Sequence, residues 1–120
     1  MKNLKNKIDI KLKIQMEKEI QFGPGKVFLM EAIKETGSIS GAAKKIGMSY
    51  RKAWKLINDL NKMAKTKMVA TSTGGKGSGG TKLTSTGVEF IAIYRNMEHK
   101  VLYAIKNEKL KLEKILNNVK

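Results

Sequence analysis

The stretch at residues 37–58, GSISGAAKKIGMSYRKAWKLIN, constrains this chain more than any other part of the sequence. Two short patterns with helical spacing meet in it at Gly47, and almost every charge in the second pattern is positive. When Gly47 is taken as the turn of a helix-turn-helix unit, the small Ala43 falls where the two helices must cross closely. The apolar packing positions of that unit then fall on Ala42, Ile46, Met48, Ala53 and Leu56. All of them are apolar, because two helices joined by a tight turn must bury one common face, so the stretch predicts a helix-turn-helix.

Capping residues predict where the helices around this unit begin and end. Pro24 is tolerated at or just ahead of a helix start, and Gly37 suits the left-handed residue that follows a helix. The hydroxyl of Ser38 or Ser40 can cap a second helix, and Ser49 can cap a third. The predicted helices are residues 26–36, about 38–46 and about 50–64.

The N-terminal part of the chain predicts a small β-hairpin. Residues 8–14, IDIKLKI, alternate apolar and charged side chains, which is the pattern of a half-buried strand. A turn over residues 16–19 and a returning strand at Ile20 and Phe22 complete the hairpin, predicted over residues 8–22. With the helices, this gives a fold class that is mainly α with small β-hairpins (α+β).

A second hairpin is predicted over residues 67–84, with the glycine-rich tip TGGKGSGG. So many glycines exclude a helix at the tip. A P-loop is also excluded, because Gly75, Lys76 and Gly80 fall in the wrong order for its consensus. A hairpin that follows a helix-turn-helix is better interpreted as a wing, with Lys76 at its tip placed to enter or flank the minor groove of DNA. Lys82 is a second, weaker candidate for a backbone contact.

The C-terminal part, residues 85–120, predicts a long amphipathic helix with a kink near Asn107. Its apolar positions recur at a spacing of three and four: Val88, Ile91, Tyr94, Val101, Ile105, Leu112, Ile115 and Val119. The simplest interpretation is a packing stripe. Because this stripe exceeds what a small core can cover, part of it is expected to pack against a second copy of the chain. A homodimer would also present two recognition helices about 34 Å apart, one DNA turn.

The charge balance limits the class of partner. Among 120 residues, 25 Lys and Arg face 10 Asp and Glu, a formal net charge of +15. That excess indicates a polyanionic partner, and nucleic acid, an anionic membrane and an acidic protein all stay open. No apolar run approaches the roughly 18 residues of a membrane span, and the N-terminus lacks an apolar secretory segment, so a cytoplasmic protein is expected. With no cysteine and a single histidine, His99, we expect no metal site, no cofactor and no enzyme activity.

The helix-turn-helix frame points the start of its second helix at DNA. Arg51 can reach guanine O6 and N7 with two hydrogen bonds, and Tyr50 can contact a thymine methyl group or a phosphate. Lys52 and Lys55 are expected to neutralise phosphates. Ser49 is a capping residue first, whose hydroxyl or neighbouring amides can also bind a phosphate.

Each of these residues also has an interpretation without DNA. A basic helix face is often only a solvated one, and that interpretation keeps most of its weight for Lys62 and Lys65. The adjoining motif favours DNA contact for Lys52 and Lys55. Trp54 is divided evenly between core packing and a contact with the DNA backbone, because a large aromatic at helical spacing is commonly packed.

The stretch FGPGKVFLMEAIKETGSISGAAKKIGMSYRKAWKLINDLN closely resembles the N-terminal domain of the ModE-type molybdate-responsive transcription regulators. In that family GPG opens the first helix, GSIS-x-AA marks the second and GMSYR-x-AW the recognition helix. The resemblance covers roughly residues 8–110 and implies a winged helix-turn-helix that dimerises through helices outside the motif, including the long C-terminal one. It also implies control of genes, often those for molybdate uptake. Its DNA-contacting positions correspond here to Ser49, Tyr50, Arg51, Lys52 and Lys55.

Full-length regulators of this family continue into C-terminal molbindin domains, and this sequence, ending at Lys120, is expected to be a single domain without them. The first hypothesis is therefore a homodimeric, sequence-specific DNA-binding transcription regulator without its own molybdate-binding domain. The alternative is a sequence-indifferent architectural or nucleoid-associated protein that binds double-stranded DNA by charge alone. Whether the chain binds constitutively, senses an effector at the dimer interface or receives its signal from another protein stays open.

Overall fold

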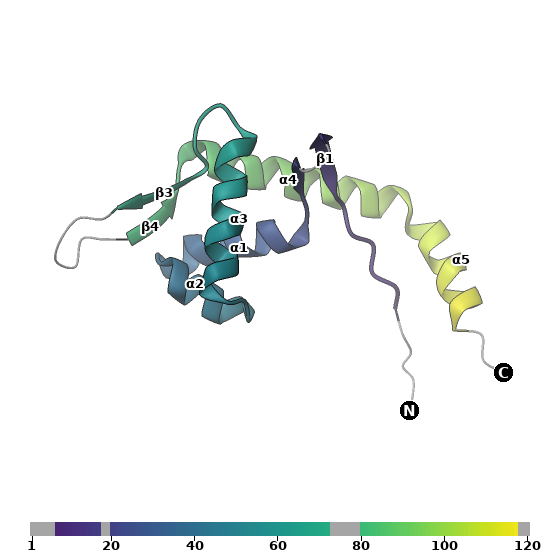
Figure 1. Cartoon of the computed structure of the whole chain (residues 1–120). Helices are drawn as coiled ribbons and strands as arrows, with labels where there is room; N and C mark the ends of the chain where they lie inside the picture. Colours follow the sequence, from purple (N-terminus) through teal and green to yellow (C-terminus); the bar gives the residue numbers. More distant parts are fainter. Residues whose placement is uncertain (1–6, 18–19, 73–79, 118–120) are drawn as a thin grey trace.

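The computed structural model describes residues 7–17, 20–72 and 80–117, and it is a winged helix-turn-helix with a long helical extension (Figure 1). In chain order its elements are β1 (Ile14–Glu17), β2 (Ile20–Phe22), α1 (Pro24–Thr36), α2 (Ile39–Ile46), α3 (Tyr50–Met63), β3 (Val69–Ser72), β4 (Gly80–Leu83), α4 (Ser85–Ala104) and α5 (Lys106–Leu116). The strands form two separate antiparallel hairpins, β1 with β2 and β3 with β4. The predicted fold class, mainly α with small β-hairpins, is confirmed.

The helix-turn-helix forms where the capping residues predicted it. The Ser38 hydroxyl accepts a hydrogen bond from the Gly41 amide at 2.8 Å, so Ser38 rather than Ser40 caps α2. The Ser49 hydroxyl accepts one from the Lys52 amide at 3.0 Å and caps α3. Between them, Gly47 has a φ of 72°, a left-handed conformation that a side chain would oppose. This tight turn fixes the angle at which α3 leaves α2.

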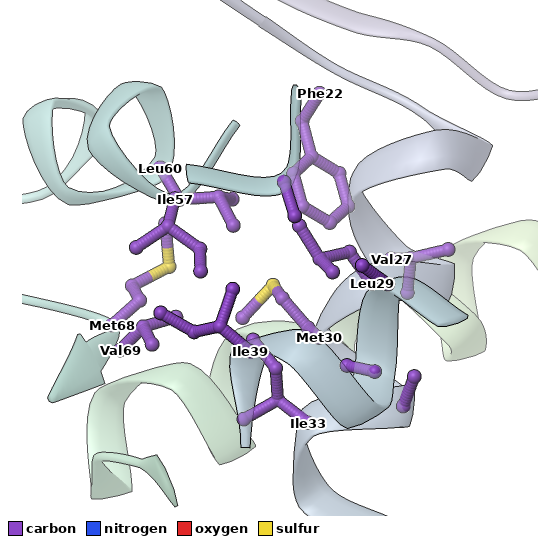
Figure 2. Packing of buried hydrophobic residues seen from close by; sticks show 14 of the residues in the cluster. Phe22, Val27, Leu29, Met30, Ile33, Ile39, Ile57, Leu60, Met68 and Val69 are labelled. Carbon is purple, nitrogen blue, oxygen red and sulfur yellow. The ribbon is translucent and has the colours of Figure 1, made fainter. Parts of the chain in front are cut away.

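The core lies between α1, α2, α3 and the first turns of α4 (Figure 2). Of the predicted packing positions, Ala42, Ala43 and Ala53 are buried. The other three, Ile46, Met48 and Leu56, are partly buried against the same cluster. The fully buried side chains include Phe22, Val27, Leu29, Met30, Ile33, Ile57, Leu60, Met68, Val69 and Tyr94. The helix-turn-helix packing prediction is therefore confirmed, and the side of α3 opposite this core is left for solvent or a partner.

Side-chain and backbone hydrogen bonds hold the β3–β4 hairpin against the helices. The Asn61 carboxamide of α3 donates to the Val69 carbonyl at 3.0 Å and accepts from the amides of Met68 and Val69 at 2.9 and 3.0 Å. On β4, the Thr81 amide donates to the Gly37 carbonyl at 3.0 Å. The hairpin is thus attached to α3 through one strand and to the α1–α2 turn through the other.

The N-terminal segment differs from its prediction. The alternation over residues 8–14 is real, since Ile8, Ile10, Leu12 and Ile14 are half-buried and the residues between them exposed. However, the hydrogen-bonded strand begins only at Ile14 and extends to Glu17, so the predicted strand over residues 8–13 and the predicted turn at Met16 and Glu17 were wrong. The physical reason is that β2 has three residues and pairs only with Ile14–Glu17. Residues 8–13 instead contact the C-terminal helices, where the Tyr94 hydroxyl donates to the Leu12 carbonyl at 2.7 Å and the Ile8 amide donates to the Glu113 carboxylate at 2.9 Å.

The C-terminal helical segment forms as two helices. Thr84 caps α4 by accepting a hydrogen bond from the Gly87 amide at 3.1 Å, so the helix starts at Ser85, before Gly87. The break comes at Ile105, with φ −106° and ψ 13°, two residues ahead of the predicted kink at Asn107. The described residues include no helix that combines the length and the apolar character needed to cross a membrane.

Arg95 ties α4 to α1. Its Nε and Nη2 donate to the two carboxylate oxygens of Glu31 at 2.9 and 2.7 Å, and its Nη1 donates to Glu98 at 2.7 Å. The guanidinium also lies 5.6 Å from the centre of the Phe28 ring. The hydrogen bonds with Glu31 and, less strongly, those with Glu98 raise the pKa of Arg95 against the opposing effect of burial, so the guanidinium stays charged.

Candidate nucleic-acid interface

The N-terminal end of α3 presents a basic surface. Its first turn exposes Tyr50, Arg51 and Lys52, and Lys55 follows one turn later, also exposed. No acidic residue lies in that first turn. The single carboxylate of α3, Asp59, pairs with Lys55 at 3.4 Å. The start of α3 therefore combines three cations with a phenol, and no negative charge competes for them within the first turn.

Trp54 shows the core packing that was one of its two predicted roles. Its side chain is half-buried and packs against the hydrophobic core cluster. At the same time it makes an edge-on contact with Tyr50, whose ring centre lies 6.3 Å away at an interplanar angle of 82°. Tyr50 itself is 54% exposed. Trp54 thus packs on the core and contacts the Tyr50 ring, and a contact with DNA at Trp54 itself stays a prediction.

The predicted contacts of the wing are described only in part. Lys82 lies on β4, opposite Ala70 of β3, and is exposed. Lys76 lies outside the described residues. Both assignments stay predictions, as do those for the residues of α3.

The structure adds two lysines that the sequence reasoning did not single out. Lys13 and Lys26 line one groove together with Lys52, Lys55 and Asp59; these five residues are called the basic groove below. The groove has a volume of about 460 Å³. Lys26 is the more enclosed of the two: its ammonium donates to the Gln21 carbonyl at 2.5 Å, and burial lowers its pKa, with Asp59 opposing and Lys55 adding to that effect.

No local signal could have identified these two lysines. Lys13 precedes β1 and Lys26 lies in the first turn of α1, so both are distant from α3 in sequence. They meet α3 only because β2 and α1 pack against it. The two lysines can therefore be assigned to this site only from the packing of β2 and α1 on α3.

The arrangement can bind a polyanion. Lysine and arginine side chains, backbone amides at a helix start and a phenol are the groups that contact DNA phosphates and base edges. Within the described part of the chain, no group of three or more His, Asp or Glu is placed to hold a metal ion.

Comparisons with known proteins agree with this geometry. Residues 26–88, which run from the first turn of α1 to the first turn of α4, match the family model described as bacterial regulatory helix-turn-helix protein, lysR family. The chain is 35% identical over 111 residues to the transcriptional regulator ModE of Yersinia pestis, covering 90% of this chain and 42% of that protein. It is 42% identical over 74 residues to the molybdenum transport protein ModE of Herbaspirillum seropedicae, covering 62% and 28%.

A third relative is the DNA-binding transcriptional dual regulator ModE of Escherichia coli K12, which is 37% identical over 86 residues, covering 72% of this chain and 33% of that protein. The chain thus spans less than half the length of the curated relatives it matches. These matches confirm the resemblance to ModE-type regulators within the stretch they cover. The chain belongs to the bacterial regulatory helix-turn-helix proteins of the lysR family.

Proposed function

We propose that this chain is a DNA-binding transcription regulator that binds duplex DNA through the start of α3 and has no catalytic step of its own. One observation carries the proposal: α3 is buried along one side by the helix-turn-helix, while its capped N-terminal end exposes Tyr50, Arg51 and Lys52. In helix-turn-helix proteins this end of the second helix lies nearest the base edges in the major groove. The relatives with the names quoted above support the same function.

The residues divide into two roles. Arg51, with two parallel N–H donors, reads guanine, a contact that discriminates against the wrong base by about 1–3 kcal/mol. Lys52 and Lys55 contact phosphates and position the helix, together with Lys82 and Lys76 of the wing. Ser49 keeps its capping role and presents the first amides of α3 to a phosphate.

We also propose that the regulator is a homodimer formed through α4 and α5. Large apolar side chains on these helices are exposed: Val88, Ile93, Met97, Val101, Tyr103, Leu110, Leu112, Ile115 and Leu116. Monomeric proteins seldom expose so many large apolar side chains on two adjoining helices, because each side chain would gain about 1.5–3 kcal/mol from full burial. A second copy of the chain covers it most simply, because a twofold axis brings the same stripe from both subunits together.

The names of the relatives support a proposal for the target genes. Two of the three relatives are named as transcriptional regulators ModE and the third as a molybdenum transport protein. We propose that this chain acts in the cytoplasm on genes for molybdate or metal transport. The net charge of +15 alone would also suit a sequence-indifferent architectural protein, so sequence preference is the property to test.

The test compares two substitutions on one helix. A binding site is first selected from random duplexes with the wild-type chain, and affinities are then measured for this site and a scrambled one. Arg51→Ala is expected to lose about 5- to 150-fold of the preference for the selected site, the equivalent of 1–3 kcal/mol. Lys55→Ala, the matched control, should weaken binding to both duplexes equally. If Arg51→Ala also affects both equally, α3 does not read the bases, and a failure to select any site favours the architectural alternative.

The dimer is tested separately by sedimentation velocity. Ile93→Glu with Met97→Glu places two charges in the exposed stripe of α4 and is expected to give monomers. Lys34→Glu on α1 is the control, because it adds negative charge at an exposed position outside α4 and α5. Dimers that persist in the double variant would remove α4 from the interface.

A further inference from the structure

The recognition helix lies between two hairpins (Figure 1). On one side β3 contacts α3, and on the other side β2 contacts it. The β3–β4 hairpin is the predicted wing. The opposite side is occupied by the end of the N-terminal hairpin and the start of α1, and this is where the basic groove runs along α3.

The basic groove follows one edge of α3. Its lining residues Lys52, Lys55 and Asp59 recur at a spacing of three and four, so they form a stripe beside the exposed face that carries Arg51. Lys13 and Lys26 close the groove from the other wall. Four lysines from three separate parts of the chain thus line one hollow, and among the described residues Asp59 is the only carboxylate that lines it.

The dimensions of DNA place a phosphate strand at this edge. An α-helix with its side chains is about 10–12 Å across, and the major groove of B-DNA is about 12 Å wide. A recognition helix therefore fills the groove, and whatever flanks the helix lies over the phosphates at the groove's two margins. The wing flanks one margin, and the basic groove flanks the other.

We propose that the basic groove receives a phosphate of the DNA strand, which makes Lys13 and Lys26 part of the DNA interface. The residue that precedes β1 and the start of α1 then form a second backbone contact opposite the wing. This inference rests on the proposed function. Lys26 is held towards the groove by its bond to the Gln21 carbonyl, so little side-chain freedom is lost on binding. Lys13 is exposed and makes no such bond among the contacts described, so its side chain can change conformation to contact the phosphate.

The proposal is tested by salt dependence. Each phosphate contact contributes about 0.9 to the slope of log affinity against log salt, so loss of one contact reduces the fall in affinity between 50 and 200 mM salt by about 3.5-fold. Lys13→Gln is expected to show this reduction on the selected and the scrambled duplex alike. Lys114→Gln on α5, at the far end of the 62 Å molecule, removes the same charge and should leave the slope unchanged.

A second variant tests the groove by an increase in affinity for DNA, which a misfolded protein would not show. Asp59→Asn removes a carboxylate that lines the basic groove and is expected to tighten binding to both duplexes, more at 50 mM than at 200 mM salt. An unchanged slope in Lys13→Gln, or unchanged affinity in Asp59→Asn, overturns the proposal. If the wild-type chain binds no duplex at all, it is the proposed function that fails instead.

The groove could alternatively hold a free anion, and amide chemical shifts of the wild-type chain separate the two ligands. Duplex DNA is expected to shift the amides of Gly25 and Lys26 beside the groove. Shifts of these amides with inorganic phosphate at constant ionic strength, with none from duplex DNA, would assign the groove to a free anion and overturn the proposal.

Discussion

The contact between Gly87 and the Met68 carbonyl supports a quantitative prediction. Gly87 lies in the first turn of α4, where a Cβ atom would stand 2.3 Å from the Met68 oxygen and 3.1 Å from its carbonyl carbon. The same oxygen accepts a hydrogen bond from the Thr84 amide at 3.0 Å. Gly87→Ala therefore forces two backbone segments apart by about 0.7 Å, the difference between 2.3 Å and the shortest tolerated 3.0 Å.

The magnitude follows from opposing effects. Forcing extra atoms into a packed site costs about 1–3 kcal/mol, and the weakened Thr84 bond costs about 1 kcal/mol more. Alanine has a higher helix propensity than glycine, which stabilises the variant by about 1 kcal/mol. The free energy of unfolding of Gly87→Ala is thus expected to fall by about 1–3 kcal/mol.

Urea denaturation followed by circular dichroism measures this change. Gly25→Ala is the matched control, because Gly25 also lies in the first turn of a helix but has no atom within 4 Å of the added Cβ. It should be neutral or stabilise the protein by up to about 1 kcal/mol. If the two variants shift the midpoint alike, the close approach at Met68 does not constrain the fold.

Two further predictions concern contacts of the same kind. Asn61→Leu leaves the amides of Met68 and Val69 and the Val69 carbonyl without their partner, so the unfolding free energy should fall by about 3 kcal/mol in urea titrations. Asn58→Ala, on the exposed side of α3, should change it by less than about 0.5 kcal/mol, and equal losses would refute the role of Asn61. The pKa of Glu113 is lowered from 4.5 by the hydrogen bond from Lys109 and, less, by that from the Ile8 amide. Its ionised form therefore stabilises the fold fully above pH 4.5, and this contribution is lost as the pH falls through the lowered pKa. The Ile8 amide shift should titrate over that acidic range and be flat in Glu113→Gln.

The parts of the fold that depend on local chemistry could be predicted from the sequence. Ser49 caps a helix because its hydroxyl reaches an amide three residues on, and Gly47 turns left-handed because it has no side chain. Ala43 and Ala53 are buried where a tight helix crossing needs small residues. Each of these outcomes is decided within a few residues of the signal.

The parts of the fold that depend on contacts between residues far apart in the sequence could not be predicted. Residues 8–13 alternate like a strand, but whether they pair depends on the length of β2, and they contact the C-terminal helices instead. Gly87 lies inside α4 because a Cβ there would meet the Met68 carbonyl, a contact between segments that no local pattern indicates. For the candidate site, the exposed start of α3 was predicted, while Lys13 and Lys26 reach it only through tertiary packing.

The fork of Arg95 has a consequence for the proposed dimer. Two nitrogens of Arg95 donate hydrogen bonds to both carboxylate oxygens of Glu31, which restricts the rotation of α1 relative to α4. Since α1 packs on α2 and α3, these helices are also fixed relative to α4. In the proposed dimer, the packing of the two α4 helices against each other would then fix the distance between the two α3 helices, with no flexible hinge between α4 and α3. The affinity for operators with altered half-site spacing should therefore fall steeply rather than gradually. Arg95→Lys, which cannot donate the paired hydrogen bonds to Glu31, should make the protein bind such operators more readily.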